Sequence, residues 1–512
     1  IAGKGVKPSI SYDGYYGITE MARMPSLMTA EEFYRYRFLK FLGYGEGGSP
    51  TALSGRPAYA MSAFEQMSLW NVDRGVSVLK EMIANGESYD WIDLVNQRGL
   101  MQNHYVSVGG SSQDVNYHMG VGYTDERGVT MGDAMSRISF KGSVDAKINK
   151  WMTAGFNINL SMNHRDFAND NAIQNAYRAN PFMKPFDADG NLNKNPGNYL
   201  SMGSTTGYQF SDQTSPLLYM ENQTKMSDAY RMLGNAYLQI KPMKGLTLKT
   251  VFQPTYRQWR LGQFDDTIVD NENSTARYNV SQSFGWVWDN ILTYDRTFNQ
   301  NHRVNITAIS SMEQHRSESA NLYYQNVMAG TYWWNLATGN YLAEDSKNSY
   351  SESSMMSYAL RGNYTYAGKY MLTATVRWDG SSKFAPGYRW GAFPSAAVAW
   401  RLSEEGFMKD IDWLSNLKLR VSYGMTGNNA GVTNYATQQT VGGPDYYYFG
   451  GAWMQAFYPS GVVDTALSWE SSREINTGLD FGFFKNRISG SIDWYNKTAY
   501  DLLFDVKLPL EA

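Results

Sequence analysis

Residues 137–163 show the pattern of hydrophobic and polar positions that repeats along most of this sequence. Between residues 138 and 148 every second residue is apolar or small, and Arg, Ser, Lys or Asp residues lie between them. After a break at Asn149 and Lys150, residues 156–163 alternate Phe, Ile, Leu and Met with Asn and Ser. Successive side chains of a β-strand point to opposite faces. The pattern therefore predicts two strands, each with one apolar face and one hydrated face.

About fifteen segments of this kind run from one end of the chain to the other, by the criterion of period-2 alternation. They are residues 9–16, 102–110, 115–123, 137–147, 153–163, 230–240, 246–255, 281–294, 303–311, 356–366, 370–378, 393–400, 417–423, 476–482 and 487–495. The sequence predicts an all-β protein.

The connections between these segments have two sizes. Short ones include residues 111–114, 148–151, 241–245, 298–301, 367–369 and 484–487, and long ones include residues 17–101, 165–228, 316–354 and 425–469. The two sizes largely alternate, so an antiparallel meander would place tight turns at one end and long loops at the other. Outer-membrane β-barrels have short periplasmic turns and long extracellular loops. A soluble β-sandwich gives no reason for this segregation.

Composition is compatible with both a soluble β protein and a membrane barrel. Aromatic residues make up 15% of the 512 residues, while the mean hydropathy is only −0.47. A barrel combines these values because its lumen and loops are polar. Segments such as 137–147 reach the roughly 9–11 residues that a membrane strand needs. We therefore expect a large antiparallel transmembrane β-barrel whose apolar rows face lipid and whose polar rows face water.

The first long connection contains a helical signal. Thr29 and Glu32 have the spacing of a capping box, Met28 and Phe33 could pack as the accompanying staple, and Gly43 is a natural stop. Residues 61–86 also have helical spacing. These features predict short helices in an extracellular loop subdomain at about residues 17–101.

Candidate chemistry is sparse. The net charge of −3 gives no case for nucleic acid, and no cysteine is present. Residues 186–193 (FDADGNLN) resemble the start of a calcium loop but lack the distal Glu, which favours a simple turn. The five histidines have no metal-ligand spacing, and no motif combines a nucleophile with a base. We expect a protein that is not an enzyme and has no cofactor or bound metal.

Four ordered blocks resemble the SusC/RagA-like TonB-dependent transporters of Bacteroidetes outer membranes. They are residues 90–129, which look like the first barrel hairpin; residues 374–408, with RWDGSSKF followed by WGAFPS; residues 417–428; and residues 467–503. The resemblance extends over nearly the whole chain.

The resemblance implies a plug followed by a 22-stranded barrel. Residues 1–8 resemble the end of the plug, and residues 9–512 would form a barrel that is incomplete at its C-terminal side. The chain begins with Ile1, so we expect it to be an interior piece of a longer protein, with the plug and the TonB box ahead of it.

The resemblance further implies active import of oligomeric nutrients, with oligosaccharides favoured over peptides. Its implied partners are a SusD-like surface lipoprotein lid, TonB and outer-membrane lipid, in a dimer of transporter–lid pairs. Two other classes stay open on the sequence alone: a non-transporting all-β surface adhesin and an outer-membrane hydrolase.

Two sets of residues are candidates for contact with substrate. Arg377, Asp379 and Arg389 lie in the RWDGSSKFAPGYRWG block, where the competing interpretation is a loop fixed by Asp–Arg contacts. Tyr446, Tyr447, Tyr448 and Trp453 lie in a long loop, and their rings could stack on sugars. The competing interpretation places these rings in the outer aromatic girdle or against the lid.

Overall fold

Sixteen strands form one antiparallel sheet in the computed structural model, which describes residues 6–33, 81–194, 196, 215–267, 273–343, 345–460 and 463–504. The first eight are β1 (Val6–Thr19), β2 (Gly99–Ser111), β3 (Val115–Arg127), β4 (Ala134–Lys147), β5 (Met152–Asp166), β6 (Gln223–Met243), β7 (Leu246–Asp265) and β8 (Thr275–Phe298). The others are β9 (His302–Gln325), β10 (Asn340–Tyr341), β11 (Lys347–Tyr366), β12 (Tyr370–Ser381), β13 (Trp390–Arg401), β14 (Leu414–Asn428), β17 (Glu470–Phe483) and β18 (Ile488–Tyr500).

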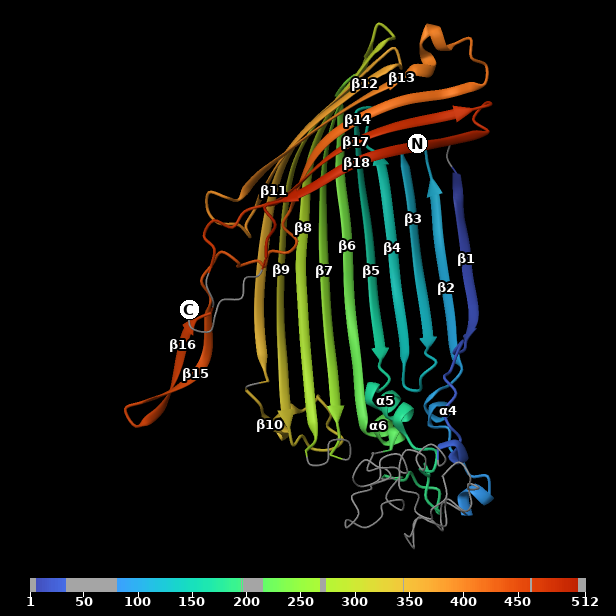
Figure 1. Ribbon diagram of the computed structural model, residues 1–512, viewed down its shortest axis with the longest axis vertical. Helices are drawn as coiled ribbons and strands as arrows, with labels where there is room; N and C mark the ends of the chain where they lie inside the picture. Colours follow the sequence, from blue (N-terminus) through green and yellow to red (C-terminus); the bar gives the residue numbers. More distant parts are fainter. Residues whose placement is uncertain are drawn as a thin grey trace, which may run out of the picture.

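The strands lie in the sheet in the order of the sequence, from β1 to β18, with only the short β10 added beside β9. Strands β1 to β9 form a tall wall, and β12 to β18 arch across its upper part (Figure 1). Strands β1 and β18 are the two edges of the sheet, and within the described residues they do not pair with each other. The sheet is therefore a curved, open part of a barrel wall, as the sequence predicted.

The pairing register follows the hydrophobic pattern. In the β4–β5 hairpin Ile138 pairs with Met162 and Phe140 with Leu160, while the intervening Ser139 pairs with Ser161. A slip of one residue would exchange the two faces, so the pattern itself fixes the register. The apolar row lies on the outside, where the side chain of Ile138 is 54% exposed. A second layer of protein packed on this face would bury Ile138. Its exposure therefore agrees with an apolar row that faces lipid.

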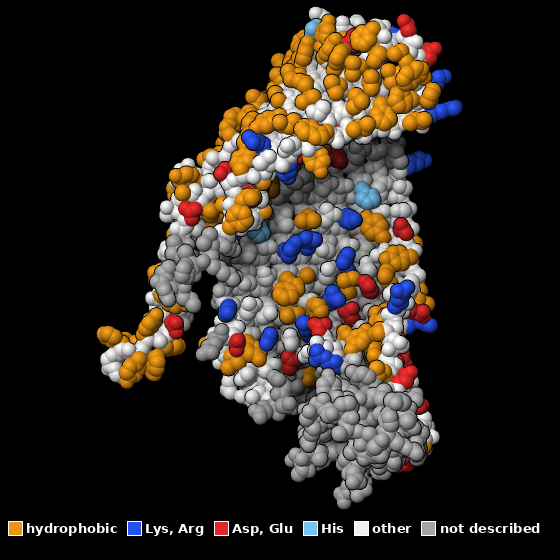
Figure 2. All heavy atoms as spheres, in the orientation of Figure 1, with side chains coloured by type: hydrophobic (Ala, Val, Ile, Leu, Met, Phe, Trp, Pro, Cys, Tyr) orange, Lys and Arg blue, Asp and Glu red, His pale blue; other side chains and the backbone are white. Residues whose placement is uncertain are grey.

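Figure 2 shows the two faces of the sheet in one view. Hydrophobic side chains crowd the outer surface of the arch at the top, and charged side chains are scattered over the hollowed wall below. The wall is seen from its concave side, because the arch lies in front of it (Figure 1). The concave face is therefore the hydrated one, and the convex face is apolar.

All fifteen predicted strands are confirmed, but several are longer than the sequence pattern indicated. Strands β7 and β9 run to Asp265 and Gln325, and β6, β8 and β11 begin earlier than predicted. Every one of these extensions lies at the end with the long loops. There the strands extend past the alternating region, and their outward positions are polar, as at Gln282 and Arg316.

Tight turns join the strands at the opposite end. In the β8–β9 turn Asn299 and Gln300 have φ of 47° and 61°, and in the β11–β12 turn Ala367 and Gly368 have φ of 51° and 71°. Two consecutive positive φ values are typical of type I′ hairpin turns, whose twist matches that of the strands.

The long-loop end contains short helices: α4 (Trp91–Val95), α5 (Asp170–Arg178) and α6 (Pro216–Asn222). Trp91 and Val95 pack against Ala176 and Met183, which joins the β1–β2 connection to the β5–β6 connection. Lys184 also binds Glu87 at 2.9 Å, and this contact lowers the pKa of the Glu87 carboxyl. Among the described residues, no helix combines the length and the apolar character needed to cross a membrane.

The predicted capping box is confirmed at the start of the first long connection. The backbone N–H of Thr29 donates to the Glu32 carboxylate at 2.9 Å, and the N–H of Glu32 donates to the Thr29 hydroxyl at 3.3 Å. Residues 30–33 form the helical turn that follows. Gly43 and most of the segment 61–86 lie outside the described residues. The plug junction proposed for residues 1–8 lies partly outside them and stays a prediction.

Candidate functional site

Polar side chains of neighbouring strands form continuous rows on the concave face. One row runs from Ser139 on β4 through Ser161 on β5 and Arg231 on β6 to Arg257 on β7. Each member follows from strand alternation, because its sequence neighbours, such as Phe140 and Leu160, belong to the outward apolar row. The sheet therefore builds a hydrated surface from residues that are far apart in the sequence.

A hollow of about 680 Å³ lies over β2 to β7 on this face. Its polar lining combines amides, hydroxyls and cations, while no Asp or Glu of the described chain contributes to it. The polar residues are Asn103, Tyr105, Thr124, Arg137, Ser139, Lys141, Asn159, Ser161, Asn163, Arg231 and Arg257. Two internal bonds order the lining: Asn103 donates to the Thr124 hydroxyl at 2.7 Å, and Arg137 donates to the Asn163 amide oxygen at 3.0 Å.

Between the hollow and the tight turns, an aromatic brace crosses the same face. The hydroxyl of Tyr237 donates to Asp145 at 2.6 Å across the intervening strand β5. The residue on β5 between them is Gly155, and a Cβ there would lie 2.2 Å from the Tyr237 ring. Gly155 is therefore needed for the ring to lie flat across the strand.

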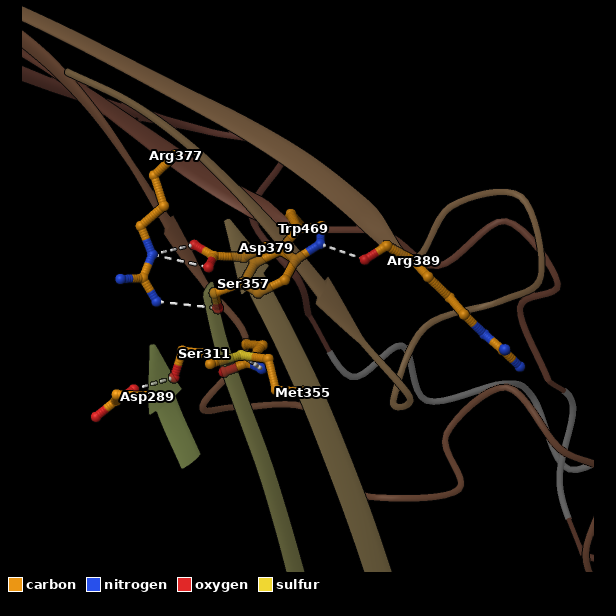
Figure 3. Close-up of polar contacts among 9 residues, drawn as sticks. Asp289, Ser311, Met355, Ser357, Arg377, Asp379, Arg389 and Trp469 are labelled. Carbon is orange, nitrogen blue, oxygen red and sulfur yellow. Dashed lines mark hydrogen bonds and ion pairs between the residues drawn. The ribbon is translucent and has the colours of Figure 1, made fainter. Parts of the chain in front are cut away.

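The predicted set around the RWDGSSKF block is partly assembled on the concave face (Figure 3). The Nε atom of Arg377 donates to both oxygens of Asp379, at 2.7 and 2.8 Å, and its Nη2 atom donates to the Ser357 hydroxyl at 3.1 Å. Asp379 is only 7% exposed. The pair has the fixed geometry of the Asp–Arg contact that the sequence offered as the alternative to a substrate site.

Arg389 does not join this pair. Its side chain extends away from Asp379 in Figure 3, while its backbone carbonyl accepts a hydrogen bond from the Trp469 indole at 2.9 Å. Trp469 packs against Phe384 and Phe393, with ring centroids 4.9 and 5.4 Å away. The backbone of Arg389 thus helps to hold a buried cluster of Phe384, Phe393, Val432 and Trp469, and its Nε atom donates to the Phe384 carbonyl at 3.4 Å.

The predicted aromatic candidates lie on a separate hairpin of β15 (Val441–Phe449) and β16 (Ala452–Pro459). This two-stranded sheet projects from the main one (Figure 1), so the structure does not bring its rings together with Arg377 and Asp379. Tyr446, Tyr447, Tyr448 and Trp453 are each more than half exposed. Tyr448 and Trp453 pair across the hairpin with ring centroids 5.4 Å apart.

The calcium-like stretch is a turn, as the sequence favoured. The Asp187 carboxylate accepts hydrogen bonds from the backbone N–H groups of Asp189 and Asn191, at 3.0 and 2.8 Å. The carboxylate thus closes its own loop. In the part of the chain that the structure describes, no group of three or more His, Cys, Asp or Glu residues could hold a metal ion.

The cations of the hollow were not among the site residues predicted from the sequence. Arg137 and Lys141 already stood in the polar row of a predicted strand, but Arg257 lies two residues beyond the predicted end of its strand. These cations could have been predicted from their pattern, because several of them occur at polar-face positions of neighbouring strands.

Comparisons with known proteins agree with this geometry. Residues 85–509 match the family model described as TonB dependent receptor-like, beta-barrel. The chain is 28% identical over 427 residues to TonB-dependent receptor P39 of Formosa agariphila, covering 82% of this chain and 39% of that protein. It is also 28% identical over 456 residues to TonB-dependent receptor SusC of Bacteroides thetaiotaomicron, covering 82% of this chain and 43% of SusC.

Among solved structures, the RagAB peptide importer in its closed-closed state is similar in fold. The TM-score is 0.78 at 21% sequence identity, and the match covers 99% of this chain and 56% of the other. The chain spans less than half the length of the curated relatives it matches. These relatives are named as TonB-dependent receptors, which agrees with the prediction that the chain is not an enzyme.

Proposed function

Because this chain belongs to the TonB dependent receptor-like β-barrel family, we propose that it forms the wall of an active importer for oligomeric nutrients. Its place is the bacterial outer membrane, which it crosses many times with its strands. The proposed cargo is an oligosaccharide, with a peptide as the alternative. Import is driven through TonB, and a SusD-like surface lipoprotein acts as the lid.

The observation that supports this proposal is the two-sided wall with unequal ends. Its outside is apolar, its concave side holds a hollow of about 680 Å³ lined by amides, hydroxyls and cations, and its long loops gather at one end. A soluble adhesin would not expose an apolar outer face of this kind to water. The amide-rich lining suits the many hydroxyls of a saccharide, because an amide both donates and accepts hydrogen bonds.

The remaining parts of the proposal concern the whole protein. A plug ahead of residues 1–8 would close the barrel lumen, and TonB would act on that plug. Two transporter–lid pairs would assemble as a dimer. The exposed hairpin of β15 and β16 is the proposed contact with cargo or lid, through Tyr446, Tyr447, Tyr448 and Trp453, while Arg377, Asp379 and Arg389 stay second-rank candidates for cargo contact.

Uptake in cells tests the proposal. Cells that lack the gene should fail to deplete one fraction of a mixed pool of oligosaccharides, and the full-length gene should restore depletion. A full-length gene without its TonB box is the matched control and should not restore it. A pool of peptides is assayed in parallel. Depletion that continues without the TonB box would contradict active import, and loss of surface attachment alone would favour the adhesin.

A further inference from the structure

The four cations of the hollow have no anionic partner among the residues that the structure describes. Arg137, Lys141, Arg231 and Arg257 are all exposed on the concave face, and none of them forms an ion pair in the described part of the chain. The contrast with other charges is clear, because Arg165, Arg260, Arg377 and Arg420 each bind a carboxylate. The hollow is therefore a site of uncompensated positive charge.

The register brings two of these like charges together. Arg231 lies directly opposite Arg257 on the neighbouring strand. Like charges at directly opposed positions of a sheet destabilise it. An anion placed between the two guanidinium groups would remove the repulsion and form charge-assisted hydrogen bonds with both.

The position and lining of the hollow indicate which anion would enter. Arg137 lies three residues from the start of β4, and the row of Arg231 and Arg257 lies in the half of the wall nearer the long loops. Asn103, Asn159 and Asn163 surround the cations with amide groups. Such a surface combines donors for an anionic group with donors and acceptors for hydroxyl groups.

We propose that this hollow binds an oligosaccharide that carries anionic groups, either uronic-acid carboxylates or sulfate esters. The inference rests on the proposed function and narrows its substrate class. Arg231 and Arg257 hold one anionic group between them, while Arg137 and Lys141 are placed for a neighbouring residue of the same chain. The amides bind the sugar hydroxyls.

The test uses the full-length transporter, with its plug, in detergent. It is applied to a panel of immobilised oligosaccharides that are neutral, uronate-bearing or sulfated, with hexaglutamate as an acidic peptide. The best acidic saccharide and its neutralised form, such as a methyl-esterified uronate, are then compared by calorimetry. We expect the acidic saccharides to be enriched, and their affinity to fall as salt is raised.

The double variant R231Q/R257Q should weaken binding of the acidic saccharide about tenfold or more and leave the neutralised form unchanged. The control is R296Q, which removes one positive charge from the outward row near the tight turns. It should bind like the parent protein. Heat-modifiable migration in electrophoresis confirms that each variant is folded.

Three results would overturn the inference. They are equal binding of neutral and acidic saccharides, selective binding of hexaglutamate alone, or a double variant that binds normally but is less stable. The last result would assign the cations to carboxylates of the plug. In each case TonB-dependent uptake of a neutral oligosaccharide or a peptide would still stand, so failure of this inference is distinguishable from failure of the importer proposal.

Discussion

Two regions of the concave face hold arginines in opposite circumstances. In the arch, Arg377 is bound to Asp379 and Ser357, beside a buried aromatic cluster. In the wall, Arg231 faces Arg257 and has no ion-pair partner among the described residues. The arch has the features of a region selected to hold its shape. The hollow in the wall keeps charge available, which is what binding a ligand requires.

The largest expected effect is in the arch. Replacing Trp469 with Ala removes the ring that joins Phe384 to Phe393, and large-to-small changes of a buried aromatic cost about 3–5 kcal/mol. We expect a lower midpoint of guanidinium unfolding for the full-length protein in detergent. Trp469→Phe keeps a ring but loses the hydrogen bond to the Arg389 carbonyl. Its midpoint of unfolding should lie between those of the parent protein and Trp469→Ala. An unchanged midpoint for Trp469→Ala would show that the cluster does not stabilise the arch.

The second effect isolates the ion pair. Asp379→Ala removes the carboxylate partner of Arg377 and should destabilise the protein by about 1–3 kcal/mol, since the pair is hydrogen-bonded but the Arg377 side chain is 46% exposed. Removing Arg377 as well should recover part of this loss. A double-mutant cycle measures the coupling, and zero coupling would refute a structural role for the pair.

The third effect has the opposite sign. Arg231→Gln in the wall should raise the free energy of unfolding by about 0.5 kcal/mol, because it removes a like-charge contact and breaks no ion pair. Guanidinium unfolding of the full-length protein measures this effect. Arg377→Gln is the comparison and should lower the free energy of unfolding, because it breaks the ion pair with Asp379. If both substitutions lower the free energy of unfolding equally, Arg231 is as important for stability as Arg377, and the two regions do not differ in this respect.

The smallest effect extends the comparison to the tight-turn end. Hydrogen bonds from Tyr370 at 2.7 Å, Lys369 at 2.9 Å and Trp400 at 3.0 Å lower the pKa of Glu405 to about 2. Because its pKa is lower in the folded state, Glu405 contributes stability above its ordinary pKa of 4.5. That contribution is lost as the pH falls from about 4.5 to about 2.

The Trp400 indole N–H resonance of the labelled protein reports this titration directly. It should shift with a midpoint near pH 2, and the shift should be absent in Glu405→Gln. A midpoint near 4.5 would mean that the three hydrogen bonds do not form in solution.

The comparison also shows where sequence reasoning succeeds. Alternation placed all fifteen strands and set the β4–β5 register, because a half-buried strand repeats every two residues whatever its partner is. Alternation did not predict the extra length of β7 and β9, because strand segments with water on both faces no longer alternate apolar with polar residues. It also missed β15 and β16, where large side chains occupy both faces.

The candidate site was harder to predict for a related reason. Arg377, Asp379 and Arg389 are close in the sequence, and two of them form a contact. Arg231 and Arg257 are a pair only because β6 and β7 are aligned in one register. Positions that meet across strands become visible only when the pairing is known. A local motif such as RWDGSSKF therefore predicts contacts between residues that are close in the sequence. It does not predict the arginine pair of the hollow.

The strictly sequential strand order has a consequence for assembly. Each strand of the main path hydrogen-bonds to the strand before it on that path, and tight turns close most of the connections at one end of the sheet. Contacts between sequence neighbours have a small entropic cost of loop closure. Such a sheet can form one hairpin at a time. The edge strand of each completed hairpin has free backbone N–H and C=O groups to which the next strand can bind.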